Sequence, residues 1–345
     1  MSKPSESLAQ ERVFAGIRAT GRQHIGNYFG AIKNFVALQD RYQCIYSIVD
    51  LHSLTTLTEI DQLSNSVFET ALDLMAAGLD PNRCVLYVQS HVPEVSELHL
   101  LLSMMVPNGW LLRVPTFKEK ARAQPDNVNY GLVGYPVLQT ADIILYKASR
   151  VPVGQDQLPH LELAREIVRR FNHHFGDMFP EPEPVLTEAP LLLGADRRKM
   201  SKSYGNQIDL AASEAESLER VRQFITDPQR ERKSDPGRPE VCNVYSLHAL
   251  FNADERPEVY RKCTQAEWGC VDCKLQLGNA INDSLGPLRT RRAELATRPD
   301  EVWEALAEGA ERARVIARSV LAETQERMGL PPARSRVAKD AAAPS

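Results

Sequence analysis

Short apolar segments alternate with amphipathic helical segments through the first half of the chain, and this alternation restricts the fold more than any other feature. Three apolar segments have the length and composition of buried strands: 13–16, 44–49 and 84–89. Segments 28–38 and 61–77 lie between them and have helical periodicity. Strands that alternate with helices form a parallel sheet with helices on both of its faces. The sequence therefore predicts an α/β fold built on a Rossmann-type parallel sheet.

The pattern changes once along the chain. Strand and helix patterns return at 135–146, 151–153 and 157–174, and the proline-rich segment 180–190 indicates an extended connection. The chain is polar and irregular between 107 and 130, which is typical of an insertion. Only helical patterns follow residue 203: 212–225, 270–285 and 299–328. We therefore expect a first domain at 1–210 with an insertion at about 107–130, an all-helical domain at 211–330, and a disordered tail at 331–345.

The composition excludes several classes of protein. At 345 residues the chain is long enough for two domains, because a single core seldom grows past about 250 residues. No apolar run reaches the roughly 18 residues of a membrane helix, and the first residues lack a signal-peptide core, so we expect a cytoplasmic protein without a membrane partner. The net charge is −4, so a nucleic acid would need local basic patches. Two candidate patches are Arg230, Arg232, Lys233 and Arg238, and Arg289, Arg291 and Arg292.

Two distant segments carry residues suited to phosphate chemistry. Gly21–Asn27 follows the first apolar strand and precedes the first helix, an arrangement that offers backbone N–H groups to a nucleotide. Far along the chain, Lys199–Ser203 places two lysines and two hydroxyls on a short polar segment beside a glycine. A loop of this composition can close over a triphosphate and neutralise the charge that develops as pyrophosphate leaves. Together the two segments predict an ATP site.

These segments resemble the two signature motifs of class I aminoacyl-tRNA synthetases, and the chain up to about Leu330 resembles the tryptophanyl-tRNA synthetases. The motifs that carry the likeness are Ile17–Gly21, His24–Asn27, Phe117–Lys120, Tyr135–Asp142, Val151–Gln157 and Lys199–Ser203. The resemblance implies a ligase that uses ATP with Mg²⁺ to activate L-tryptophan as tryptophanyl-adenylate and then transfers it to tRNA(Trp). It also implies a homodimer, a catalytic first domain and an anticodon-binding helical domain.

Activation joins the amino-acid carboxylate to the α-phosphate of ATP, an in-line displacement in which the protein mainly positions groups and stabilises charge. The resemblance implies that four residues act in catalysis: Lys199, Ser201, Lys202 and Lys120. It implies that a larger set binds ATP: Arg18, Ala19, Thr20, His24, Gly26, Asn27, Gly154, Gln155, Asp156, Leu191, Lys199, Met200, Ser201, Lys202 and Ser203. Asn27 stands where the first signature often has a second histidine. The tryptophan and tyrosine branches accept this change, so activity is expected to be retained.

The amino-acid pocket is implied in the same way. Its expected residues are Phe14, Gly16, His52, Tyr135, Gln139, Asp142, Val151, Val153 and Gln157. Asp142 would accept the indole N–H, while Tyr135 and Gln157 would hold the substrate ammonium. Tyrosyl-tRNA synthetases carry a similar Tyr, Gln and Asp pattern, so a tyrosine-specific ligase is the nearer alternative. Phe14 favours tryptophan, because tyrosine enzymes have a tyrosine there whose hydroxyl meets the substrate phenol, and an unpaired buried hydroxyl is costly.

Four of the six cysteines gather in the helical part: Cys242, Cys263, Cys270 and Cys273. Buried thiols, a zinc site and an iron–sulfur cluster can each explain such a group. Only Cys270 and Cys273 are close in sequence, a spacing that favours iron–sulfur over zinc slightly. The resemblance here is to a bacterial subset of tryptophanyl-tRNA synthetases, and it implies a 4Fe-4S cluster on these four ligands near the docked anticodon. Cys44 and Cys84 lie in apolar strands and are expected to be buried thiols.

A second alternative belongs to another class of protein. A chain with this fold could be a non-catalytic iron–sulfur protein that binds RNA or senses redox state. Such a protein would be expected to have lost the signature lysines. Lys199 and Lys202 are both present, and this favours the enzyme.

Overall fold

The centre of the molecule is a five-stranded parallel sheet, in a computed structural model that describes residues 11–55, 60–186 and 191–331. The strands are β1 (Arg12–Arg18), β2 (Gln43–Val49), β3 (Val85–Val88), β4 (Arg150–Val153) and β5 (Glu183–Leu186). They lie in the order β3-β2-β1-β4-β5, and every neighbouring pair is parallel. The predicted α/β fold with a Rossmann-type sheet is confirmed. Most of the predicted tail, from residue 332 onward, lies outside the described residues.

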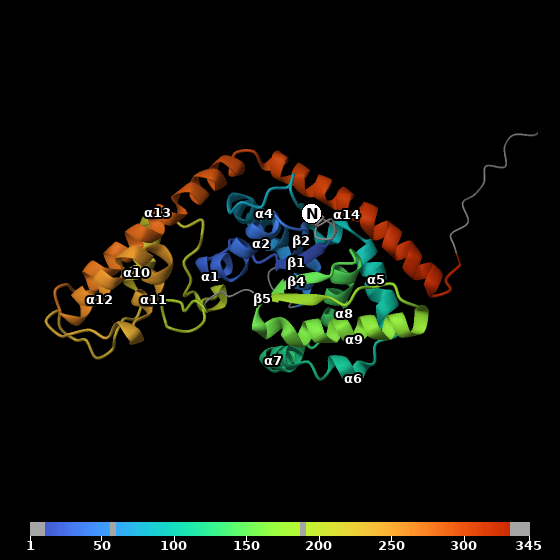
Figure 1. Cartoon of the computed structure of the whole chain (residues 1–345), viewed down its shortest axis with the longest axis horizontal. Coiled ribbons are helices and arrows are strands. Elements are labelled where there is room, and N and C mark those ends of the chain that lie inside the picture. The colour runs from blue at the N-terminus through green and yellow to red at the C-terminus, as the bar shows by residue number, and fades with distance from the viewer. Residues whose placement is uncertain (1–10, 56–59, 187–190, 332–345) are drawn as a thin grey trace, which may run out of the picture.

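Helices cover both faces of this sheet (Figure 1). One face carries α1 (Ile25–Asn27), the π-helical segment η2 (Tyr28–Ile32), α2 (Lys33–Leu38) and α4 (Leu63–Ala76). The other carries α8 (Tyr130–Ile144) and α9 (Leu158–Phe175), with α5 (Glu94–Ser103) beside α8. Successive side chains of a strand point to opposite faces. Val13 and Ala15 of β1 therefore belong to the first core, and Phe14 belongs to the second.

The strand order reverses between β1 and β4. The chain runs outward from β1 through β2 to β3, and then crosses back to place β4 on the other side of β1. In open parallel sheets, ligands bind beyond the carboxyl ends of the strands at such a switch point. The carboxyl ends of β1 and β4, at Arg18 and Val153, therefore mark the place where a ligand site is expected.

The segment 107–130 is helical, and the prediction of an irregular segment was wrong on this point. It forms α6 (Asn108–Leu111) and α7 (Pro115–Ala123), and Pro115 stands in the first turn of α7, where proline is well tolerated. Three apolar residues of the segment are buried in the same core as α8 and α9: Leu111, Val114 and Phe117. Both helices are short and bury few apolar residues. Their sequences therefore show little of the apolar periodicity by which a helix is predicted.

The proline-rich segment contains a strand that the sequence did not predict. Residues of β5 pair with β4 in register, so that Pro184 stands opposite Val151. Because β5 is an edge strand, it can hold a proline whose missing N–H would otherwise interrupt the ladder. Residues 187–190, which follow β5, lie outside the described residues.

Beyond Leu186 the described residues form helices joined by loops, and they contain isolated bridges but no further strand. Their α-helices are α10 (Glu214–Arg222), α11 (Asn243–Phe251), α12 (Arg256–Thr264), α13 (Cys270–Ala296) and α14 (Pro299–Arg327). Long α13 leads from the α10–α12 group back to the sheet, and α14 passes along β3 (Figure 1). A Cβ at Gly309 of α14 would lie 1.9 Å from the carbonyl oxygen of Leu86, so only glycine permits this close approach.

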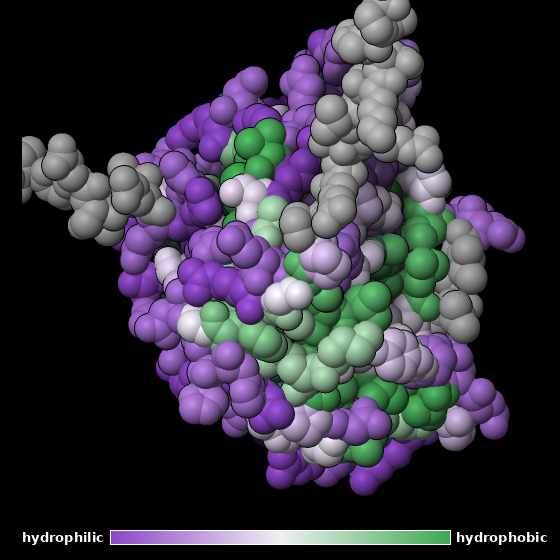
Figure 2. All heavy atoms as spheres, turned by 90° about the vertical axis from the view of Figure 1, so that its right-hand side faces the viewer, coloured by the Kyte–Doolittle hydropathy of each residue, from purple (hydrophilic) through white to green (hydrophobic). Residues whose placement is uncertain are grey.

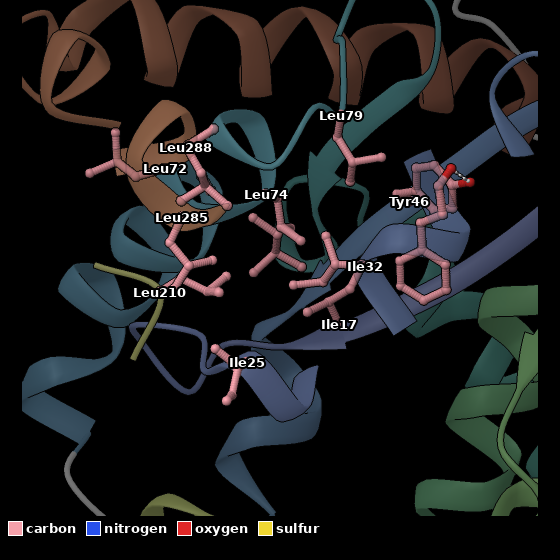
Figure 3. Close-up of a cluster of buried hydrophobic side chains, with 14 of the residues drawn as sticks. Ile17, Ile25, Ile32, Tyr46, Leu72, Leu74, Leu79, Leu210, Leu285 and Leu288 are labelled. Carbon is pink, nitrogen blue, oxygen red and sulfur yellow. Dashed lines mark hydrogen bonds between the residues drawn. The ribbon is translucent and has the colours of Figure 1, made fainter. Parts of the chain in front are cut away.

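The helical part therefore shares a core with the sheet instead of forming a wholly separate one. Figure 3 shows Leu285 and Leu288 of α13 beside Leu72 of α4, with Leu210 packed below them. All four side chains are at least nine-tenths buried. The boundary at residue 210 stays a prediction. No helix in the described ranges has both the length and the apolar composition needed to cross a membrane.

Candidate active site

The turn between β1 and α1 has a shape fixed by its own residues. Gly21 has a φ of 77°, a conformation in which an L side chain is strained. His24 Nδ1 accepts the Asn27 N–H at 3.2 Å, and the Asn27 side-chain oxygen accepts the His24 N–H at 3.1 Å. A Cβ at Gly26 would lie 2.8 Å from His24 Nδ1, so this position is closed to larger residues. The reciprocal pair holds His24 at the start of α1.

The segment Lys199–Ser203 lies against this turn. The Lys202 ammonium donates to the carbonyl oxygen of Thr20 at 2.6 Å. Met200 is 3% exposed, and its Cβ lies 3.5 Å from the position of a Cβ on Gly26. Two segments that are far apart in sequence therefore meet in space, as a common ATP site requires.

Backbone hydrogen bonds just after the lysine segment hold the two parts together. The Ile25 N–H donates to the Ile208 carbonyl at 3.0 Å, and the Leu210 N–H donates to the Gln23 carbonyl at 2.8 Å. Buried Asn206 fixes the segment from within, because its side-chain oxygen accepts the Ser201 N–H at 2.8 Å. Gln23 and Asn206 were not predicted as site residues, since neither carries a group that reacts.

Burial and nearby charge set the protonation of His24. Burial, followed by the positive charges of Lys202 and Lys199, lowers the pKa of His24 to about 4. Burial also lowers the pKa of the Lys202 ammonium. At neutral pH the imidazole is therefore neutral and adds no positive charge to this end of the site.

A cavity of about 450 Å³ opens at the carboxyl ends of β1 and β4, the switch point of the sheet. All nine residues expected in the amino-acid pocket line it: Phe14, Gly16, His52, Tyr135, Gln139, Asp142, Val151, Val153 and Gln157. Three residues expected to meet ATP or its phosphates line it as well: Arg18, Lys120 and Gly154. The sequence-based residues thus converge on one space. What each of them binds stays a prediction.

The acidic group in this cavity is held by an amide. Asp142 is 1% exposed, and the Gln89 side-chain amide donates to both of its oxygens at 2.9 and 2.8 Å. His52 Nε2 lies 3.1 Å from the same carboxylate. Gln89, at the end of β3, was missed by the sequence analysis. Its position at a strand's carboxyl end was the one available signal, and many glutamines share it.

The far wall of the cavity carries a second polar group of residues. The Tyr135 hydroxyl lies 2.7 Å from His160 Nε2, and Thr116 Oγ1 lies 2.8 Å from the same nitrogen. The Lys120 ammonium stands 4.3 Å from the centre of the Tyr135 ring, a cation–π contact. Burial, then the charge of Arg18, lowers the pKa of Lys120. His160 and Thr116 were not predicted, because nothing in their local sequence marks them.

The remaining predicted ATP residues are not among those that line this cavity. Gln155 and Asp156 are exposed in the short helix η6 (Gln155–Gln157) that follows Gly154. A Cβ at Gly154 would lie 2.7 Å from an Asp156 oxygen, which explains the glycine. Ala19 is buried beside the turn, whereas Ser203 and Leu191 are exposed, the latter by 65%.

The four clustered cysteines converge in the helical part. Cys242 precedes α11, Cys263 lies in α12, and Cys270 and Cys273 stand in the first turn of α13. Burial first, and then negative charge on other thiolates of the group, raises the pKa of Cys273. The sulfur atoms are therefore near enough to influence one another. As these side chains stand, no set of three or more His, Cys, Asp or Glu residues in the described chain is arranged to hold a metal ion. Cys44 and Cys84 are buried thiols, as predicted.

The two candidate basic patches differ in the structure. Arg289 and Arg292 of the second patch point inward: Arg292 Nε donates to Asp73 at 2.6 Å, and Arg289 donates to the Leu210 carbonyl at 3.2 Å. Two of the three guanidinium groups of this second patch are therefore used inside the protein, whereas Arg291 is exposed and its Nη1 donates to the Ala76 carbonyl at 3.1 Å. In the first patch Arg232, Lys233 and Arg238 are exposed. This surface lies beside the cysteines, since Arg230 Nη1 is 3.6 Å from Cys263 Sγ.

Comparisons with known proteins identify the family of the chain. The profile of the family described as tRNA synthetases class I (W and Y) matches residues 7–286. The tryptophan–tRNA ligase of Deinococcus radiodurans is 45% identical over 325 residues, which cover 92% of this chain and 98% of that protein. The ligase of Thermotoga maritima is 43% identical, with 92% and 99% covered.

Solved structures give the same result. The crystal structure of tryptophanyl-tRNA synthetase from Campylobacter jejuni, complexed with ADP and tryptophan, matches with a TM-score of 0.86 and 34% identity. The match covers 92% of this chain and 100% of that one. A tyrosyl-tRNA synthetase from Archaeoglobus fulgidus shares the fold at 19% identity and a TM-score of 0.63. The chain therefore belongs to the class I tRNA synthetases of the tryptophan and tyrosine group, within the family of tryptophan–tRNA ligases.

Proposed function

We propose that this enzyme binds L-tryptophan in the cavity, joins it to ATP as tryptophanyl-adenylate, and passes the tryptophanyl group to tRNA(Trp). The observation that carries the proposal is the position of the cavity. It lies at the switch point of the sheet, and Arg18, which lines it, ends the strand that leads into the His24 turn. An amino acid in the cavity would thus have its carboxylate near the α-phosphate of an ATP held between that turn and Lys202.

Amino-acid selection rests on the apolar walls and one acceptor. Asp142 accepts the indole N–H, and Gln89, which is fully buried and is not among the lining residues of the cavity, donates to both oxygens of the carboxylate. Phe14 is 3% exposed and stacked 5.8 Å from the Tyr146 ring, so this part of the wall offers no partner to a phenol. Tyr135 and Gln157 receive the substrate ammonium, which is a donor only.

Phosphate chemistry rests on the two signature segments. Lys199, Lys202 and Ser201 stabilise the pyrophosphate as it leaves, together with the Mg²⁺ that accompanies ATP, and Lys120 reaches the phosphates from α7. His24 and Asn27 contact the phosphates from the turn, while Gly26 and the segment Gly154–Asp156 accept adenine and ribose. No side chain acts as a covalent nucleophile. The amino-acid carboxylate itself attacks the α-phosphate.

The test is amino-acid-dependent exchange between ATP and pyrophosphate, measured with the full set of amino acids. We expect exchange with tryptophan and at least about 100-fold less with tyrosine, because a phenol in this pocket lacks its partner. Exchange with tyrosine and not tryptophan would reassign the enzyme to the tyrosine branch. No exchange with any amino acid would favour the non-catalytic alternative.

The proposal includes a 4Fe-4S cluster on Cys242, Cys263, Cys270 and Cys273. Its support is the donor set: four half-buried thiols from α12, from the first turn of α13 and from the residue before α11, with exposed Lys233 beside them. A bound cluster would tie the start of α13 to α11 and α12. Four thiolates also suit zinc, which is the alternative.

Metal analysis of protein purified without oxygen separates these possibilities. We expect brown protein with about four irons per chain, lost in Cys270→Ser and retained in the control Cys44→Ser. Colourless protein with one zinc per chain would favour zinc. Protein without either metal would show that the four cysteines are free thiols.

Partners follow from the same proposal. The exposed patch Arg232, Lys233 and Arg238 contacts tRNA(Trp), and 211–330 acts as the anticodon-binding domain of a cytoplasmic enzyme.

Figure 2 shows a broad apolar area on the face that carries α5. Exposed apolar residues on or near α5 and α6 include Leu100, Met104 and Leu112. An apolar surface of this kind is typical of an interface, and a homodimer would bury it. Sedimentation analysis tests this, with Met104→Lys expected to favour monomers.

A further inference from the structure

One buried histidine in the cavity has no part in the proposed contacts with ATP or tryptophan. His160 stands near the start of α9 and is 4% exposed. Its Nε2 is shared by two hydroxyl groups, those of Tyr135 at 2.7 Å and Thr116 at 2.8 Å. Its Nδ1 is buried and has no hydrogen-bond partner within the described residues. The ring therefore makes its polar contacts on one side only, toward the cavity.

The direction of the Tyr135 hydroxyl decides what that residue can bind. An ammonium group only donates hydrogen bonds, so Tyr135 must offer it an oxygen lone pair. The hydroxyl proton then has to point to another acceptor. Neutral His160 with its proton on Nδ1 supplies that acceptor at Nε2. In the other tautomer, Nε2–H donates to a hydroxyl, and the Tyr135 proton is free to point at the substrate.

We propose that His160 is a positioning residue for the substrate amino group: its Nε2 accepts the Tyr135 hydroxyl proton and so turns the oxygen lone pairs of Tyr135 toward the ammonium of tryptophan. This inference rests on the proposed function, in which Tyr135 contacts that ammonium. No residue of the turn or the lysine segment takes part in it.

The surroundings of His160 keep its ring neutral. Burial, followed by the charge of Lys120, lowers the pKa of His160. The titratable groups that face it are Lys120 of α7, Tyr135 of α8, Asp156 of η6 and His52 of α3, which spans Asp50–Leu54. Of these, Asp156 alone opposes the effect of Lys120, and it is exposed. A neutral ring at pH 7 retains the lone pair that the Tyr135 proton needs.

Two substrate fragments separate this role from general packing. Tryptamine carries the ammonium and lacks the carboxylate, whereas indole-3-propionate carries the carboxylate and lacks the ammonium. Both are measured as competitive inhibitors of tryptophan-dependent exchange. In His160→Phe, which fills the space without an acceptor, we expect tryptamine and tryptophan to bind about 10- to 100-fold more weakly. Indole-3-propionate should bind within about threefold of its wild-type affinity.

A conservative variant and a double variant complete the test. His160→Gln offers an amide oxygen as acceptor, so tryptamine binding should recover in part, and this variant serves if His160→Phe does not fold. Tyr135→Phe should weaken tryptamine binding by a similar factor. Adding His160→Phe to this variant should weaken the binding little further, because both changes remove the same contact with the ammonium. Equal weakening of both fragments, or none in either, would overturn the inference. Wild-type enzyme without tryptophan-dependent exchange would instead refute the proposed function.

Discussion

The Lys202 ammonium donates a 2.6 Å hydrogen bond to the Thr20 carbonyl oxygen, although 182 positions separate the two residues in sequence. The contact joins the lysine segment to the turn that follows β1 and contains His24. A carbonyl oxygen carries only partial charge, so an anionic phosphate is the stronger partner for this ammonium. A triphosphate bound between the His24 turn and the lysine segment would therefore replace the Thr20 carbonyl as the partner of the Lys202 ammonium.

Replacing Lys202 should slow the chemical step and spare amino-acid binding. Lys202→Ala removes a positive charge that strengthens its contacts as pyrophosphate leaves, so we expect exchange to fall about 100- to 1000-fold. Tryptophan affinity, measured by fluorescence or calorimetry, should change little, because Lys202 does not line the cavity. The control Lys233→Ala, a 69% exposed lysine near the cysteines, should exchange normally. A Lys202→Ala enzyme of near-normal exchange rate would contradict the assignment.

Asp142 should control recognition of the indole. Asp142→Asn keeps the size of the side chain, but it removes the charge and sets an amide N–H₂ against the donors of Gln89. We expect kcat/KM for tryptophan in exchange to fall about 10- to 100-fold, mostly through KM. Asp177→Asn, a change at an exposed site, is the matched control. Equal behaviour of the two variants would remove Asp142 from the recognition site.

Arg292 should matter for stability because it neutralises a buried carboxylate. Asp73 is fully buried, and it accepts hydrogen bonds from Arg292 and from the Gln23 N–H of the signature turn. Arg292→Met leaves Asp73 without its cation, and we expect the free energy of unfolding to fall by about 3–5 kcal/mol. Arg298→Met removes an exposed pair and should cost at most about 1 kcal/mol. Urea denaturation measures both, and similar losses would show that the Arg292 contact is unimportant.

The lowered pKa of His24 predicts that the free energy of unfolding depends on pH. Its pKa in the folded enzyme is about 4, whereas an unfolded histidine titrates near pH 6.5. Between these values the unfolded chain binds the extra proton, so stability is full above pH 6.5 and is lost progressively as the pH falls toward 4.

The corresponding variant is His24→Asn, which can keep the cap on α1. Its free energy of unfolding should fall less between pH 7 and pH 5 than that of wild type. His91→Asn, at an exposed histidine, should behave as wild type. Parallel curves for wild type and His24→Asn would mean that His24 protonates equally in both states.

Local pattern predicted the sheet, and the resemblance to the synthetases implied the contents of the cavity, but neither could predict the contacts that orient these residues. Tyr135, Gln139 and Asp142 share one helix, so their spacing alone places them on one wall. Gln89 comes from another element, and only the assembled sheet brings it to Asp142. The partner of Arg292 also depends on tertiary packing. Arginines on a helix have the same sequence pattern whether they face solvent or a buried carboxylate.

The central claim is that one ligand extends from Asp142, past Arg18, to the turn and loop joined by Lys202. A crystal structure with a non-hydrolysable tryptophanyl-adenylate analogue measures this most directly. We expect the indole nitrogen within hydrogen-bonding distance of Asp142 and the phosphate between the His24 turn and the Lys202 segment. An analogue bound with its indole outside this cavity, or its phosphate away from both segments, would contradict the account.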